Sequence, residues 1–278
     1  MATGKDLYKS NIENISRLIE ELFKQNPYCD GDPFGMEKES LKKGLLISQL
    51  FYKYYFRCQT QGTENIPKGA VIMAANHGGQ LPFDGAMITT ALLIESAVPR
   101  VPRSMVDRWV STIPFISNWY SQMGVVPGTP ENAALLLKRK EILLTFPEGI
   151  KGIQKTFKDA YNLQPFGTGF IRLALANNAP VVPVSVVGSE EQYPTMFTIK
   201  RGAHLLNMPH IPIWAHMPIP ILGLMPLPVK YYIHFGEPII LKGDPDDDDD
   251  IISKMSDLVK DVIAENINIL LKKRSSLF

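Results

Sequence analysis

The segment 76–84, with the sequence NHGGQLPFD, holds a histidine and an aspartate separated by six residues. Asn76 and His77 end an apolar stretch, 70–75, that predicts a buried strand, and two glycines after His77 leave the backbone open to a substrate. If Asp84 holds one imidazole nitrogen, the other is free to act as a general base. On spacing alone, the more common explanation is a loop histidine followed by an unrelated aspartate at a helix start.

A second polar turn, with the sequence FPEGIKG at 146–152, follows another apolar stretch at 141–146. The carboxylate of Glu148, the ammonium of Lys151 and two glycines are groups that can bind an anion or a hydroxyl. Taken by itself, the same segment describes a solvated turn, which is the more common outcome. Both polar turns therefore need the fold around them before either becomes a site.

Other catalytic and binding signatures are missing from the sequence. A Gly-x-Ser-x-Gly elbow and a P-loop lysine motif do not occur, and Gly167-Thr168-Gly169 lacks the third glycine of a dinucleotide fingerprint. The five aspartates at 246–250 lack the alternation and the distal Glu of a calcium loop. We expect no metal site and no bound cofactor, and we interpret the aspartates as the charged start of the last helix.

Helical and strand patterns alternate along the chain and predict an α/β fold with a mixed central sheet and flanking helices. Apolar spacing predicts helices at 5–25, 37–56, 84–94, 131–140, 167–177 and in the last 28 residues. Short apolar runs predict strands at 70–75, 141–146, 181–187 and 230–235. His77 and Glu148 each follow one of these strands, at the sheet edge where α/β proteins place their sites.

The chain divides into three parts on this pattern. Residues 1–60 form a pair of amphipathic N-terminal helices, 61–243 form the α/β domain, and 244–278 form an acidic turn with a closing amphipathic helix. A net charge of +1 argues against a nucleic-acid partner, although 96–158 carries nine Lys and Arg against four Asp and Glu. That local excess suits an anionic headgroup or a coenzyme phosphate.

The two polar turns and one strand resemble, in order, the motifs of the glycerophospholipid acyltransferase family, which includes the 1-acylglycerol-3-phosphate acyltransferases. Asn-His with a following Asp comes first, Phe-Pro-Glu-Gly comes about seventy residues later, and an apolar strand with Pro183 comes last. The resemblance covers roughly residues 60–240. Each motif is modest alone, but the ordered set is specific.

The resemblance implies roles for individual residues. His77 matches the family's catalytic base, and Asp84 matches the carboxylate that orients it. The third motif, implicated in acceptor binding and site architecture, is matched by Phe146, Pro147, Glu148 and Gly149. Pro183 matches the fourth motif, on a strand near the acyl donor. Since the acceptor hydroxyl attacks directly in this family, no enzyme nucleophile is expected.

The sequence departs from the family pattern at three points. Six residues separate His77 from Asp84 where the family has four, so the loop must bulge to preserve their contact. Lys151 stands where the third motif usually has Arg, and 124–129 offers no Arg in the second motif. The candidates to replace these phosphate ligands are Arg103, Arg108 and Arg172.

The predicted activity is transfer of a fatty acyl group from acyl-CoA or acyl carrier protein to a hydroxyl of a lysophospholipid or related lipid, as in phospholipid biosynthesis. Two alternatives remain open. A thioesterase would use the same His77 and Asp84 to activate water. A non-catalytic lipid-binding protein would keep the fold without turnover. The sequence does not decide the oligomeric state.

We expect a peripheral protein on the cytoplasmic side of a membrane, since the sequence shows neither a signal peptide nor a simple transmembrane helix. The segment 202–229 carries no formal charge but holds six prolines, which a spanning helix does not tolerate. It is predicted to line an acyl-chain tunnel, to dip into the membrane surface, or simply to cover the core. The N-terminal helices are a second candidate for membrane contact.

Overall fold

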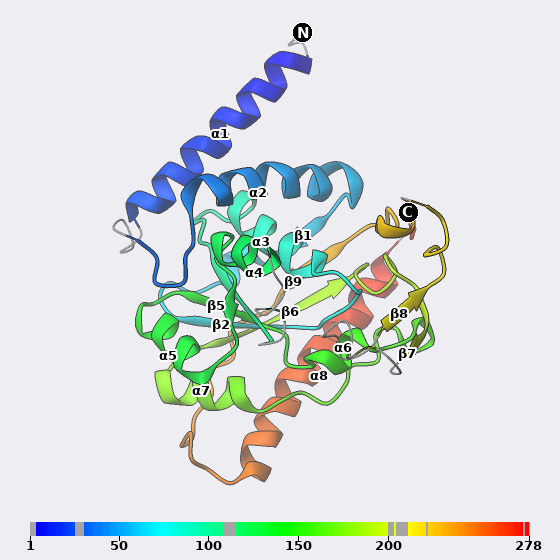
Figure 1. Ribbon diagram of the computed structural model, residues 1–278. Helices are drawn as coiled ribbons and strands as arrows, with labels where there is room; N and C mark the ends of the chain where they lie inside the picture. The colour runs from blue at the N-terminus through cyan, green and yellow to red at the C-terminus, as the bar shows by residue number, and fades with distance from the viewer. Residues whose placement is uncertain are drawn as a thin grey trace.

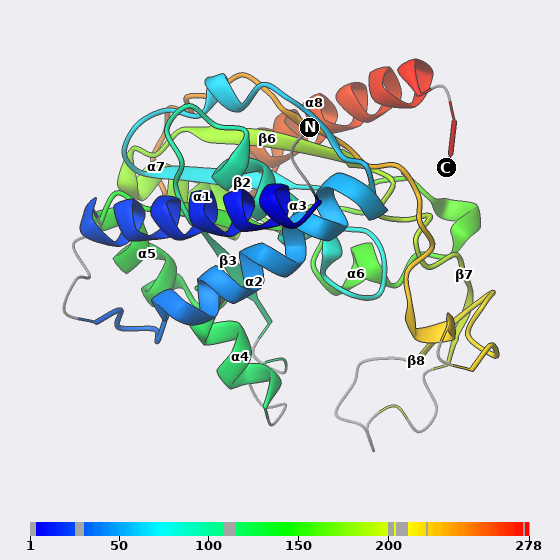
Figure 2. The ribbon, with the colours of Figure 1, turned by 90° about the horizontal axis from the view of Figure 1, so that it is seen from above.

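The computed structural model describes residues 4–25, 31–107, 110, 115–199, 203, 211–220, 222–274 and 276–277 of the chain. Figure 1 shows a central sheet with helices packed on both faces, and Figure 2 shows the same layers from above. The predicted α/β class is confirmed, as are an N-terminal helical pair and a closing C-terminal helix.

Within the described residues, seven strands form the central sheet in the order β1-β9-β6-β2-β5-β3-β4. All neighbouring strands run parallel except β6 and β9, which are antiparallel, so the sheet is mixed. The strands are β1 Gln59–Gln61, β2 Val71–Ala75, β3 Pro102–Val106, β4 Val126–Pro127, β5 Ile142–Thr145, β6 Val181–Val187 and β9 Tyr232–Phe235.

Helices cover both faces of the sheet, which explains why every residue of β2 and β6 is buried. Alternate side chains of β2 enter two separate cores: Ile72 packs toward α5, α7 and α8, whereas Met73 packs toward α3. The helices are α1 Gly4–Gln25, α2 Lys38–Leu50, α3 Phe83–Ile94, α4 Ile116–Gln122, α5 Pro130–Lys138, α6 Ile150–Ile153, α7 Gly169–Asn177 and α8 Asp249–Lys273.

The N-terminal helices form a third, smaller core. Ile15 and Ile19 of α1 pack with Leu41 and Leu45 of α2, and Leu93 joins α3 to them. The helix predicted over 37–56 ends as an α-helix at Leu50 and continues as a π-helical turn, Phe51–Tyr55. Membrane contact by the N-terminal helices stays a prediction.

Part of the uncharged segment 202–229 pairs with the residues before it and forms a second small sheet. Strands β7 Thr195–Ile199 and β8 Ile211–Trp214 are antiparallel, and a 3-10 helix, Leu222–Leu224, follows them. Among the helices that the structure describes, none combines the length and apolar character needed to cross a membrane.

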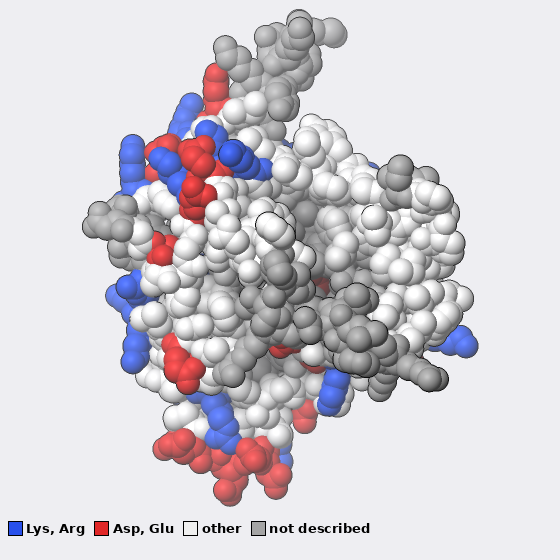
Figure 3. Space-filling view, in the orientation of Figure 1, with Lys and Arg blue, Asp and Glu red and all other residues white. Residues whose placement is uncertain are grey.

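Charged side chains are unevenly spread over the face seen in Figure 3. Acidic atoms gather at the bottom of the view, where the turn before α8 lies, and both signs mix around α1 and α2 at the upper left. Much of the remaining face, including the side that carries β7 and β8, is uncharged.

Candidate active site

The first polar turn begins where β2 ends, and Asn76 fixes that end to the neighbouring strand. The Asn76 side-chain amide donates to the Val186 carbonyl oxygen at 2.9 Å, and its oxygen accepts from the Val186 backbone N–H at 2.7 Å. Since β6 is buried along its whole length, these two hydrogen bonds attach the end of β2 to the interior of the sheet. They thereby fix the point at which His77 leaves the sheet.

His77 and Asp84 are in direct contact despite the six residues between them. His77 Nδ1 lies 2.6 Å from Asp84 Oδ2, and the Asp84 side chain has no exposed area. The same carboxylate accepts backbone N–H groups from Gly78 at 3.2 Å and Gly85 at 2.7 Å. Asp84 lies in the first turn of α3 after the N-cap Pro82, so it holds the loop as well as the imidazole, rather than capping the helix.

The surroundings of His77 prepare it to accept a proton at its other nitrogen. A carboxylate only accepts hydrogen bonds, so neutral His77 carries its proton on Nδ1 and leaves Nε2 free. Burial disfavours the charged imidazolium, but attraction from Asp84 and Glu148 outweighs it and raises the pKa of His77. The side chain remains 18% exposed and stacks on Phe146 with ring centroids 4.3 Å apart.

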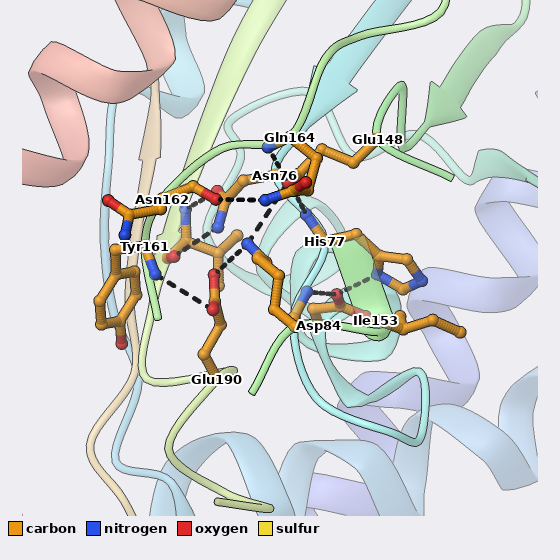
Figure 4. A network of polar contacts seen from close by, with 12 residues as sticks. Asn76, His77, Asp84, Glu148, Ile153, Tyr161, Asn162, Gln164 and Glu190 are labelled. Carbon is orange, nitrogen blue, oxygen red and sulfur yellow. Dashed lines mark hydrogen bonds and ion pairs between the residues drawn. The ribbon is translucent and has the colours of Figure 1, made fainter. Parts of the chain in front are cut away.

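Glu148 of the second polar turn supports the backbone of the first turn. Its Oε1 accepts the His77 backbone N–H at 3.0 Å, and its Oε2 accepts the Gln164 backbone N–H at 2.8 Å. Figure 4 shows Glu148 directed toward the His77 backbone, away from the imidazole ring. The side chain is fully buried and forms an ion pair with Lys155 at 3.3 Å. These contacts match an architectural role, and a role in acceptor binding stays a prediction.

Lys155 joins Glu148 to a second buried carboxylate, Glu190. Lys155 Nζ lies 2.7 Å from Glu190 Oε1, and the Tyr161 backbone N–H donates to Glu190 Oε2 at 3.1 Å. Burial raises the pKa of Glu190 to about 7, against the opposing attraction of Lys155. We call Glu148, Lys155 and Glu190 the buried charge cluster.

The segment that carries Glu190 packs tightly under the histidine loop. A Cβ atom on Gly78 would lie 2.4 Å from Glu190 Cγ and 2.7 Å from Ser189 Oγ. Gly79 has a φ of +78°, which favours glycine, and a Cβ there would lie 2.2 Å from Gln192 Nε2. Sequence reasoning missed this segment, although its four polar residues, 189–192, begin one residue after an apolar strand, as His77 lies one residue after β2.

A cavity of about 1390 Å³ opens beside His77. Its walls come from α2, α3, β3, α4, β5 and α7 and are mainly apolar; Phe51, Trp119 and Leu143 are examples. Phe146 and Gly149 also line it, so the second polar turn contributes to both the cavity and the buried charge cluster. The cavity is large and its lining is mainly apolar, so it suits alkyl chains. Ligand pockets typically combine such an apolar lining with a few polar groups that orient the ligand.

The structure brings together only some of the other predicted residues. Lys151 is exposed on α6, while Arg108 lies outside the described residues. Arg172 lines the cavity, but its guanidinium binds Asp249 at 2.7 Å and the carbonyl oxygens of the acidic turn. Arg103 is fully buried between Asp32 at 2.8 Å and Glu141 at 3.0 Å, so its charge is already matched inside the fold.

Two motif residues, Pro147 and Pro183, are not among the residues that line the cavity. Pro183 is buried in the middle of β6, opposite Ala74, and its carbonyl oxygen accepts the Gly236 N–H at 2.8 Å. The Pro147 carbonyl oxygen accepts the Gly167 N–H at 2.8 Å. Across the described residues, no three His, Cys, Asp or Glu side chains come together as metal ligands.

Comparison with known proteins matches this site to a family. The family model described as Acyltransferase matches residues 57–187, which include the His77–Asp84 pair and both polar turns. An uncharacterized protein of Mycobacterium tuberculosis is 38% identical over 257 residues, covering 89% of this chain and 71% of that protein. The DGAT1/2-independent enzyme synthesizing storage lipids of Gallus gallus is 27% identical over 183 residues, covering 65% of this chain and 52% of that enzyme.

A solved structure shares the fold. The crystal structure of the 1-acyl-sn-glycerophosphate (LPA) acyltransferase PlsC from Thermotoga maritima matches with a TM-score of 0.54 and 19% identity, covering 97% of this chain and 99% of that one. Together with the match to the Acyltransferase family model, this shared fold bears out the predicted resemblance to the glycerophospholipid acyltransferases. The chain belongs to the acyltransferase family, and it is an O-acyltransferase.

Proposed function

We propose that this enzyme transfers a fatty acyl group from an acyl thioester, carried by coenzyme A or acyl carrier protein, to a hydroxyl of a lysophospholipid or related lipid. One observation carries the proposal: His77, in contact with Asp84, presents its free nitrogen beside a large apolar cavity. The lipid-acting relatives and the shared fold support it.

In this mechanism His77 is the general base and Asp84 is its orienting partner. Nε2 takes the proton of the acceptor hydroxyl while the hydroxyl oxygen attacks the thioester carbonyl carbon. A C–O bond forms, the C–S bond breaks, and the departing thiolate takes the proton back from the imidazolium. Asp84 and Glu148 stabilise the transient positive charge, which is consistent with the direction of the His77 pKa shift.

Of the cations expected to hold a phosphate, Arg103 is paired with carboxylates inside the fold, and Arg172 is paired with the exposed carboxylate of Asp249. Acceptors with and without a phosphate group therefore belong in the same experiment. Since donor and acceptor both carry acyl chains, we propose that the enzyme works as a peripheral protein on the cytoplasmic side of a membrane, in phospholipid biosynthesis or a related route.

The test is mass spectrometry of the products formed by purified protein from acyl-CoA or acyl carrier protein and a panel of lysophospholipids and neutral hydroxyl lipids. We expect an acylated lipid for at least one acceptor, with release of one thiol per ester formed. Free fatty acid without any acylated lipid would replace the proposal with a thioesterase. Lipid binding without turnover for any donor would indicate a non-catalytic protein.

A further inference from the structure

The small β7–β8 sheet and the segment that follows β8 expose several large apolar side chains. Phe197 is 53% exposed and Leu224 is 72% exposed. We define the apolar hairpin face by its exposed members, which are Met196, Phe197, Ile199, Met217, Ile219, Leu224 and Met225. Contiguous exposed apolar patches on a protein surface mark interaction sites for proteins or membranes.

The charge pattern around this face favours a lipid surface. The described residues 195–199, 203, 211–220 and 222–229 include no Asp, Glu, Lys or Arg. In the sequence, the only charged residues from 192 to 229 are Lys200 and Arg201, and both are basic. An apolar segment whose only charged residues in the sequence are basic is typical of segments that lie in a membrane interface and attract anionic lipids.

Hydrogen bonds connect the apolar hairpin face to the loop that carries His77. The Gln80 side-chain amide donates to the Ile153 carbonyl oxygen at 2.7 Å and to Thr195 Oγ1, at the start of β7, at 3.0 Å. Within the hairpin unit, the Tyr193 hydroxyl donates to the Leu224 carbonyl oxygen at 2.8 Å. The face is thus held in a defined position relative to the active site.

Exposed apolar residues also surround the opening of the cavity. Ile47 of α2, Leu81 of the histidine loop and Trp119 of α4 line the cavity and are exposed, so they mark where it reaches the surface. Phe115, just before α4, is 91% exposed. Both α4 and β8 project toward the bottom of Figure 2, which is the side that faces the viewer in Figure 3.

We propose that the apolar hairpin face docks on a lipid bilayer and, together with the exposed end of α4, turns the cavity opening toward the membrane. The choice of a bilayer over a protein partner rests on the proposed function, because both substrates carry acyl chains. A lipid would then pass from the bilayer to His77 through the mainly apolar cavity.

Vesicle flotation of the full chain, with phosphatidylcholine alone and with added phosphatidylglycerol, tests the proposal without any need for turnover. The variant Phe197→Ser/Leu224→Ser removes two exposed apolar side chains, and we expect its partition coefficient to fall by about tenfold per residue. The matched control is Ile240→Ser/Leu258→Ser, which changes exposed residues outside the hairpin face and should stay within about twofold of the wild type.

Three outcomes would overturn the proposal: wild-type protein that does not float with either vesicle, a hairpin variant that floats like the wild type, or equal losses in both variants. If a second copy of the chain covers the apolar hairpin face instead of a bilayer, size-exclusion chromatography will detect a dimer. A wild-type dimer that becomes monomeric in the hairpin variant, with unchanged flotation, would also overturn it.

Acyl transfer to detergent-dispersed substrate should survive in the hairpin variant. If transfer is absent from the wild type while flotation behaves as expected, the function fails and the docking surface stands.

Discussion

Replacing Lys155 by Met tests the buried charge cluster under the histidine loop. The ammonium lies 2.7 Å from Glu190 and 3.3 Å from Glu148, and the three side chains are almost completely buried. Methionine fills most of the same volume without the charge, so the two carboxylates lose their shared partner. Breaking a buried ion pair by removing one member typically costs about 3–5 kcal/mol of unfolding free energy.

Glu190 makes this cost depend on pH. Its pKa is already raised to about 7 by burial, and without Lys155, which opposes that shift, it should rise further. Below about pH 7 the Glu190 carboxyl is protonated in both the wild type and Lys155→Met. Above about pH 7 it ionises in the wild type, whereas in the variant it keeps its proton to a higher pH. From about pH 7 to about pH 8.5 the destabilisation should therefore grow by about 2 kcal/mol, at 1.36 kcal/mol per unit.

Urea unfolding at about pH 6 and about pH 8.5 measures this difference. Lys158→Met, a change at an exposed lysine in the same segment, is the matched control and should cost under about 0.5 kcal/mol at either pH. The double variant Lys155→Met/Glu190→Gln should lose the pH dependence, because the titrating group is gone. A destabilisation by Lys155→Met that matches the control, or one that does not change with pH, would refute the reasoning.

Three further changes test other contacts of the site. Asp84→Asn should lower kcat by about 10³–10⁴, because an amide no longer orients the imidazole. The pKa of His77 should also fall, because the Asp84 charge that raises it is removed, and the acidic limb of the kcat/KM profile should move to lower pH. Gly78→Ala should destabilise the fold by about 1–3 kcal/mol in urea unfolding, through its clash with Glu190. Arg103→Leu should cost about 3–5 kcal/mol in the same assay, because two carboxylates lose their buried partner.

Elements with a strong local pattern were predictable from the sequence. The continuous apolar runs of β2, β5 and β6 and the long amphipathic helix α8 lie close to their expected positions. The short strands β1, β3 and β4 were not predicted, because segments of two to five residues carry little periodicity and become strands only by pairing with neighbours; β3 and β4 also contain a proline. The β7–β8 pair was missed for the same reason.

The site was predictable where one segment contains the chemistry. His77 and Asp84 lie in one short segment of the sequence, and the family motif pointed to both. The contact between Lys155 and Glu190 joins residues 35 positions apart, and only the fold determines that they meet. Arg103 shows the opposite limit: its charge suggested a phosphate ligand, but its burial among carboxylates depends on residues distant in sequence.

The role of His77 as the general base is tested most directly by the initial rate of acyl transfer in His77→Ala, measured by mass spectrometry of the acylated lipid. A circular dichroism spectrum and an unfolding midpoint like those of the wild type would show that the fold is intact. We predict a rate reduced by about 10²–10⁴, because the acceptor hydroxyl loses the group that takes its proton. A folded variant that keeps more than about a tenth of the wild-type rate would contradict that role.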